Sequence, residues 1–172
     1  LTDPYKNRDS RPDERNEYTF STGYRHFFDE QDAALHLHYR YFDDDWGVSS
    51  HTLDLAWYQN LGDRTRVIPF LRYYTQDAAS FYSDNFDREY NFMARDKELS
   101  DFEDHSVGIA LSYEVLNQGW GVLERASLNA KYSHFWFDYS NFRDLTTAGA
   151  PGEESTYDFT ADVIEFYLSV WY

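Results

Sequence analysis

The sequence contains no cysteine and only one methionine among its 172 residues. Without thiols, neither a disulfide framework nor a thiolate metal site can form. The apolar runs are also too short for a membrane-spanning helix, which needs roughly 20 consecutive apolar residues. This last absence leaves membrane strands open, because a barrel strand is short and only half apolar.

Positively charged residues are also few. Lys and Arg together number 15 against 31 Asp and Glu, which gives a net charge of −16. Proteins that bind nucleic acid need clustered Lys and Arg to neutralise phosphates. We therefore expect no nucleic-acid partner.

Aromatic residues, by contrast, are abundant. The chain has 16 Tyr, 14 Phe and 5 Trp, yet its mean hydropathy is −0.75. This combination is unusual for a soluble globule and typical of a barrel with an aromatic girdle and a wet interior. The length predicts a single domain over residues 1–172.

Residues 160–172 alternate between large apolar and other side chains up to the terminal tyrosine. A strand places alternate side chains on opposite faces, so one face of this segment is apolar. The segment resembles the C-terminal strand of Gram-negative outer-membrane β-barrel proteins. That resemblance implies outer-membrane lipid and the barrel-assembly machinery as partners, and a periplasmic C-terminus. The alternative is the last buried strand of a soluble sandwich.

Six further segments show strand-like alternation, at about 16–28, 33–42, 49–60, 64–76, 106–115 and 125–136. Helical periodicity is absent throughout. We therefore predict an all-β fold, an antiparallel transmembrane β-barrel. Closed single-chain bacterial barrels have even strand numbers, so the seven visible strands are expected to be the C-terminal part of a larger barrel.

The predicted connections alternate in length along the chain. They are short at 29–32, 61–63 and 117–120, and longer at 43–49, 79–99 and 141–154. Outer-membrane barrels have short periplasmic turns and longer external loops. We therefore expect the three longer segments to be external, together with residues 1–15 as an external loop.

The alternation divides the strand residues into a polar face and an apolar face. We expect the polar set to line a lumen: Arg25, His36, His38, Arg40, Asp54, Arg66, Arg72, Asp104, Glu114, Arg125, Asn129, Lys131 and Glu165. We expect the apolar set to face the membrane: Leu35, Leu37, Leu53, Leu55, Trp57, Ile109, Leu111, Leu128, Ile164, Phe166, Leu168, Val170 and Tyr172.

The short turns also predict which residues pair across the hairpins. The turn at 29–32 sets Arg25 opposite His36. A turn at 117–120 sets Ser112 opposite Arg125 and Ser106 opposite Lys131, which leaves Glu114 diagonal to Arg125 and Asp104 diagonal to Lys131.

Several segments resemble an uncharacterised bacterial outer-membrane family that is catalogued as a domain of unknown function. They are residues 3–5, 11–13, 34–41, 43–47, 50–53, 55–59 and 71–74. The likeness is close over about residues 1–82. It implies the location and the fold class, and a longer N-terminal part in other members, but no substrate or catalytic residue.

Candidate chemistry is sparse. His36 and His38 share a face and could hold a transition metal, although polar lumen residues are the favoured interpretation. Ca²⁺ binding by Asp43, Asp44 and Asp45 is the alternative to a plain acidic external turn, and the same choice applies to the loop residues Ser83, Asp84, Asn85 and Asp87. We expect no other cofactor.

Catalytic motifs are missing from the sequence. It has no G-x-S-x-G, H-E-x-x-H or P-loop pattern. Ser133 and His134 are adjacent on a strand and therefore face opposite ways. We expect no enzyme activity.

Two functions remain open. The first is a porin-like channel or transport protein of unknown substrate. The alternative is a structural or partner-binding barrel with a filled lumen and interacting external loops. Strand number distinguishes them, because about eight strands leave a packed interior and sixteen leave an aqueous channel.

Overall fold

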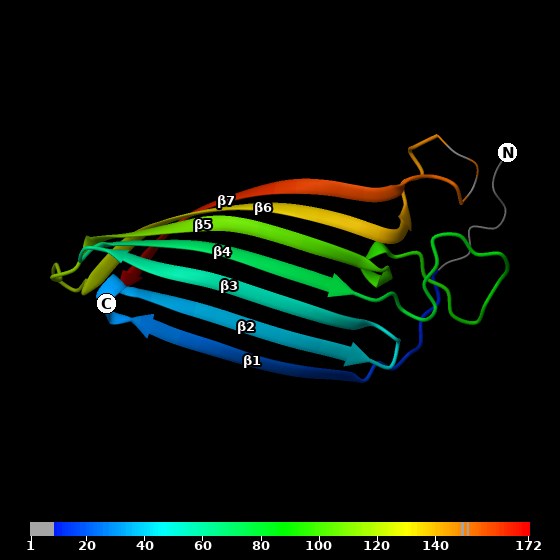
Figure 1. Cartoon of the computed structure of the whole chain (residues 1–172), viewed down its shortest axis with the longest axis horizontal. Helices are drawn as coiled ribbons and strands as arrows, with labels where there is room; N and C mark the ends of the chain where they lie inside the picture. Colours follow the sequence, from blue (N-terminus) through cyan, green and yellow to red (C-terminus); the bar gives the residue numbers. More distant parts are fainter. Residues whose placement is uncertain (1–8, 149, 151) are drawn as a thin grey trace.

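The computed structural model describes residues 9–148, 150 and 152–172. Seven antiparallel strands form one sheet in sequence order (Figure 1). The strands are β1 (Glu17–Phe28), β2 (Ala33–Asp44), β3 (Ser49–Leu61), β4 (Thr65–Gln76), β5 (Phe102–Leu116), β6 (Arg125–Arg143) and β7 (Thr156–Trp171). Two 3₁₀ turns complete the list, η1 (Asp29–Gln31) and η2 (Lys97–Leu99).

The predicted all-β class is confirmed, but the sheet is open. Among the described residues, β1 pairs only with β2, and β7 pairs only with β6. Within the same residues, no helix is long and apolar enough to cross a membrane. The structure thus shows an antiparallel sheet, and closure of that sheet into the expected barrel stays a prediction.

The first hairpin has the predicted register. Phe28 lies opposite Ala33, and Arg25 lies opposite His36. The 3₁₀ turn η1 joins the two strands, and Asp32 closes it in the left-handed region at φ 47°, a conformation that Asp tolerates better than most residues.

The hairpin between β5 and β6 was predicted wrongly. Ser112 lies opposite Asn129, and Lys131 lies opposite Ala110. The chain reverses at Gly121 and Val122 rather than within 117–120, because Trp120 and Leu123 exchange backbone hydrogen bonds of 2.7 and 3.1 Å. The resulting shift of four residues is even, so every side chain keeps its predicted face.

The connections form two groups at opposite ends of the sheet. Those after β1, β3 and β5 lie at the end where the chain terminates, which we call the turn end (Figure 1). Those after β2, β4 and β6 lie at the other, the loop end. The segment after β2, residues 45–48, is no longer than residues 29–32, so the expected length alternation fails there.

The strands at the C-terminal side are longer than predicted. β5 begins at Phe102, β6 runs to Arg143 and β7 begins at Thr156, so the loop predicted at 141–154 is shortened. Residues 1–8 of the predicted N-terminal loop lie outside the described residues. Residues 9–16 run along the loop end, where Ser10 pairs with Met93.

The compact hydrophobic core lies at the loop end and not under the sheet. Val48, Ala79, Ala94 and Leu99 are buried there, packed by Phe42, Trp46, Phe81 and Tyr82. On the strands, buried residues are mostly small or polar, such as Ala33, Ser106 and Ser133. The sheet therefore has no apolar core of its own among the described residues.

Candidate functional site

Exposure on the sheet is inverted relative to a soluble protein. On β5, the apolar residues Val107, Ile109, Leu111, Tyr113 and Val115 are 42–49% exposed. The alternate residues on the same strand are small or polar and mostly half-buried, and Ser106 is 3% exposed. A water-soluble sheet buries its apolar face, so this pattern is the reverse of the one that such a sheet shows.

The apolar face forms a band of limited height. On β5 it extends from Val107 to Val115, and on β7 from Ile164 to Val170. A membrane strand of about 9–11 residues crosses the hydrocarbon layer. The band on β5 therefore has the height of a membrane crossing.

The register brings each predicted set of side chains together. All thirteen residues predicted to line a lumen lie on one face, and twelve of the thirteen predicted to face the membrane lie on the other. The thirteenth, Tyr172, follows the end of β7 and is outside the paired register. Alternation alone was enough to divide them. That one face meets water and the other lipid stays a prediction.

Charges on the polar face are arranged in rows across the strands. His38, Asp54 and Arg72 lie opposite one another on β2, β3 and β4, with Asp54 3.5 Å from the His38 ring and 3.8 Å from Arg72. Each of these side chains is about half exposed, so each pair contributes no more than about 1 kcal/mol.

Two further ion pairs lie on this face. Arg125 is 3.8 Å from Glu114, which confirms the predicted diagonal contact. Lys131 is 3.0 Å from Glu165, whereas the sequence predicted Asp104 as its neighbour. The shifted register of β6 explains the difference, because Asp104 lies opposite Phe137.

The polar face is concave. A hollow of about 550 Å³ is lined by residues from β1 to β6, which a flat sheet cannot provide. Its charged and imidazole lining consists of Arg25, His36, His38, Asp54, Arg72 and Lys131. Every Lys or Arg on the strands β1–β5 and β7 lies on this face.

Tyrosine hydroxyls border the apolar face on its loop side. Tyr39 bonds to His51 at 2.7 Å, Tyr73 to Glu103 at 3.1 Å and Tyr132 to Asp162 at 2.7 Å. In each case the partner lies one row nearer the loop end. Tyrosine rings with one apolar and one wet end are typical of a membrane interface. The sequence indicated an aromatic girdle but did not locate it.

Aromatic rings also line the loop end of the polar face, which the sequence analysis did not identify as a cluster. Phe137 stacks on Phe159 at 4.5 Å between ring centres, and Phe102 on Tyr139 at 5.1 Å. The Lys97 ammonium of η2 lies 5.5 Å from the centre of the Phe159 ring. The loop between β4 and β5 therefore contacts the polar face at its loop end.

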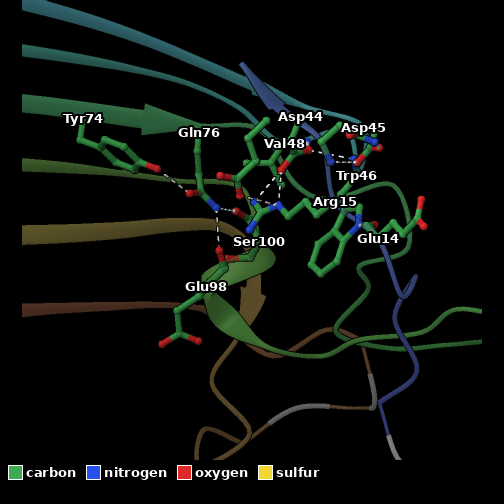
Figure 2. Close-up of polar contacts among 12 residues, drawn as sticks. Glu14, Arg15, Asp44, Asp45, Trp46, Val48, Tyr74, Gln76, Glu98 and Ser100 are labelled. Atoms are coloured by element: carbon green, nitrogen blue, oxygen red, sulfur yellow. Dashed lines mark hydrogen bonds and ion pairs between the residues drawn. The ribbon is translucent and has the colours of Figure 1, made fainter. Parts of the chain in front are cut away.

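Gln76 anchors that loop from the end of β4 (Figure 2). Its amide nitrogen donates to the carbonyls of Glu98 at 2.9 Å and Ser100 at 2.7 Å. The Tyr74 hydroxyl donates to the Gln76 side-chain oxygen at 2.6 Å. Because Gln76 is buried with these bonds made, η2 is fixed against the sheet.

Asp44 organises the β2–β3 turn (Figure 2). Its side chain is fully buried and accepts from the Trp46 and Val48 amides, both at 2.9 Å. The Arg15 guanidinium donates to its other oxygen, with Nε at 2.7 Å, and lies 4.7 Å from the centre of the Trp46 ring. One carboxylate thereby holds the residues around Arg15 on the turn.

Three of the carboxylates considered as alternative calcium ligands have protein partners. Both oxygens of Asp44 are occupied as described, and Arg143 binds Asp84 at 2.6 Å. Asp45 accepts from the Asn16 side chain and backbone at 2.7 and 3.0 Å, and these hydrogen bonds hold the pKa of Asp45 below its usual range. Calcium binding by these loops stays the alternative to a plain acidic turn.

The paired histidines have separate neighbours. The His36 ring lies 4.2 Å from the Tyr58 ring, and His38 faces Asp54. Ser133 and His134 face opposite ways, as predicted: Ser133 is buried on the polar face, while His134 lies on the other face and contacts Asp162 at 2.7 Å.

Together, the sheet and its two faces define an all-β protein with an exposed apolar band and a concave polar side. Residues 2–135 match the family model described as "Protein of unknown function (DUF3570)". The chain belongs to this family, which confirms the expected membership of an uncharacterised family. No curated protein and no solved structure matches the chain.

Proposed function

We propose that this chain forms part of the wall of an outer-membrane β-barrel that acts as a channel or transport protein. The observation that carries the proposal is the inverted exposure of β5, where apolar residues point outward and small or polar residues point to the concave side. Lipid is the environment in which such an outward face is stable.

The open edges support a wide barrel. Unpaired strand edges in lipid cost several kcal/mol for each free backbone group, so β1 and β7 need further strands. Direct closure of seven strands would give an odd number and a parallel seam, since both edge strands run toward the turn end. We favour a barrel of about twelve to sixteen strands, formed with additional strands of a longer polypeptide.

The concave face favours a conducting lumen. Its hollow of about 550 Å³ is lined by mixed charges, which are costly in lipid but stable in water. The second candidate, a structural or partner-binding barrel, is favoured by the folded loop end, where Arg15 and Asp44 hold a rigid surface.

Conductance of the full-length protein in planar bilayers tests this function. We expect discrete current steps, and we expect Arg72→Glu to shift the reversal potential toward cation preference because Arg72 lines the hollow. Leu71→Val, on the neighbouring residue of the apolar face, is the control and should leave selectivity unchanged. Silence at all voltages, with insertion demonstrated, would favour the structural barrel.

The proposal also places the loop end outside the cell and the turn end in the periplasm. Arg88 is exposed in the loop between β4 and β5, and Arg64 is exposed in the turn between β3 and β4. Trypsin added to intact cells should therefore cleave at Arg88 and spare Arg64 until the outer membrane is permeabilised. Mapping the cleaved peptides by mass spectrometry checks this. Cleavage at Arg64 alone, in the protein on intact cells, would show that the orientation is the opposite of the one proposed.

A further inference from the structure

We propose that Glu103, His105 and Asp138 form a binding site for a divalent transition metal ion on the outer wall, at the loop side of the apolar band. Each offers one ligand atom, and these atoms lie within 4.8 Å of one another. The proposal does not depend on whether the barrel conducts.

The three side chains are positioned by paired strands. Glu103 on β5 lies directly opposite Asp138 on β6, and His105 is two residues further along β5 on the same face. Ladder hydrogen bonds hold both strands, so only side-chain rotation is needed to assemble the ligands. Tetrahedral ligands at about 2.0–2.2 Å from Zn²⁺ lie roughly 3.5 Å apart, which requires closure by roughly 1 Å.

Unbalanced negative charge is the second observation. Asp158 on β7 lies directly opposite Asp138, which makes a row of three carboxylates on neighbouring strands. Like charges directly opposite each other destabilise a sheet. Within residues 9–148, 150 and 152–172, no Lys or Arg lies within 4.0 Å of any of these three carboxylates. A bound cation would remove the repulsion.

Tyr73 supports the arrangement from β4. Its hydroxyl bonds to Glu103 at 3.1 Å, and its ring centre lies 4.9 Å from that of His105. Hydrogen bonds from a surrounding shell typically orient metal ligands in this way.

The ligand types select the class of metal. One imidazole with two carboxylates suits Zn²⁺ and its neighbours in the first transition row. Mg²⁺ and Ca²⁺ favour all-oxygen ligand sets. His105 and Asp138 are exposed and Glu103 is half-buried, so the ion would keep an open coordination position facing water.

Zn²⁺ titration of the full-length protein, purified in detergent and freed of metal with a chelator, tests the site. We expect one Zn²⁺ per chain by calorimetry, and a rise in the unfolding temperature on binding. His105→Gln and Asp138→Asn should each weaken binding by at least the 10- to 100-fold that loss of an outer partner typically costs, and Tyr73→Phe by about 10-fold.

His134→Gln is the matched control, because His134 is an outer-face imidazole whose only close carboxylate, among the residues that the structure describes, is Asp162. This variant should bind Zn²⁺ as the unmodified protein does. Absence of stoichiometric Zn²⁺, unchanged binding in both His105→Gln and Asp138→Asn, or equal displacement by millimolar Mg²⁺ would each overturn the proposal. Strand content by circular dichroism establishes that the variants are folded.

Discussion

On the proposed lipid-facing wall, replacing Leu111 by arginine should destabilise the protein by about 2–4 kcal/mol, the cost of a cationic side chain at the middle of a strand in lipid. Leu111 lies at the centre of the apolar band on β5 and is exposed on the outward face. The measurement is the free energy of unfolding in lipid vesicles, taken from a denaturant titration.

The control is the same change one residue later. Ser112 lies on the polar face opposite Asn129 and Arg66, so Ser112→Arg adds a cation to a face that already carries charge. We expect a loss of no more than about 1 kcal/mol, the size of an exposed charge interaction. A larger loss of unfolding free energy for Ser112→Arg than for Leu111→Arg would show that the assignment of the two faces is reversed.

Replacing Asp44 by alanine should release the β2–β3 turn from the residues around Arg15. The change removes the acceptor of two backbone amides and of the Arg15 guanidinium. Breaking a buried ion pair from one side typically costs about 3–5 kcal/mol. We expect the loss of unfolding free energy to lie at the low end of this range, because the Arg15 side chain is 32% exposed.

Hydrogen exchange measures this effect where it arises. The amides of Trp46 and Val48 should lose protection in Asp44→Ala, while the amides of β5 keep theirs. Asp45→Ala is the control: Asp45 is exposed and bonds only to Asn16 among the described residues, so this change should lower the free energy of unfolding less than Asp44→Ala does. Equal protection at Trp46 in both variants would contradict the role given to Asp44.

Alternation along each strand was enough to predict the two faces, because side-chain direction depends only on parity along the chain. The predicted faces are correct even on β6, where the predicted register is wrong, because a shift of four residues preserves parity. Turn geometry was less predictable. The residues from Asn117 to Trp120 contain one glycine, but Gly121 follows, and the contact between Trp120 and Leu123 decides where the chain reverses.

The loop end could not be predicted because its contacts are distant in sequence. Arg15 reaches Asp44, Ser10 pairs with Met93, and Arg143 binds Asp84. The candidate metal ligands were missed for a related reason. Glu103 and His105 show the spacing of one strand face, but Asp138 joins them only through the β5–β6 register, which the sequence did not predict correctly.

The central claim is that the apolar face meets lipid, and spin labels along β5 test it most directly. These 172 residues contain no cysteine. With any cysteine elsewhere in the full-length protein replaced by serine, single cysteines at positions 106, 107, 109, 110, 111 and 112 each carry one label in bilayers. We predict that collision with oxygen, which concentrates in lipid, is highest at 107, 109 and 111. Collision with a water-soluble nickel chelate should be highest at 106, 110 and 112. The reverse alternation, or equal accessibility to both reagents along the strand, would contradict the account.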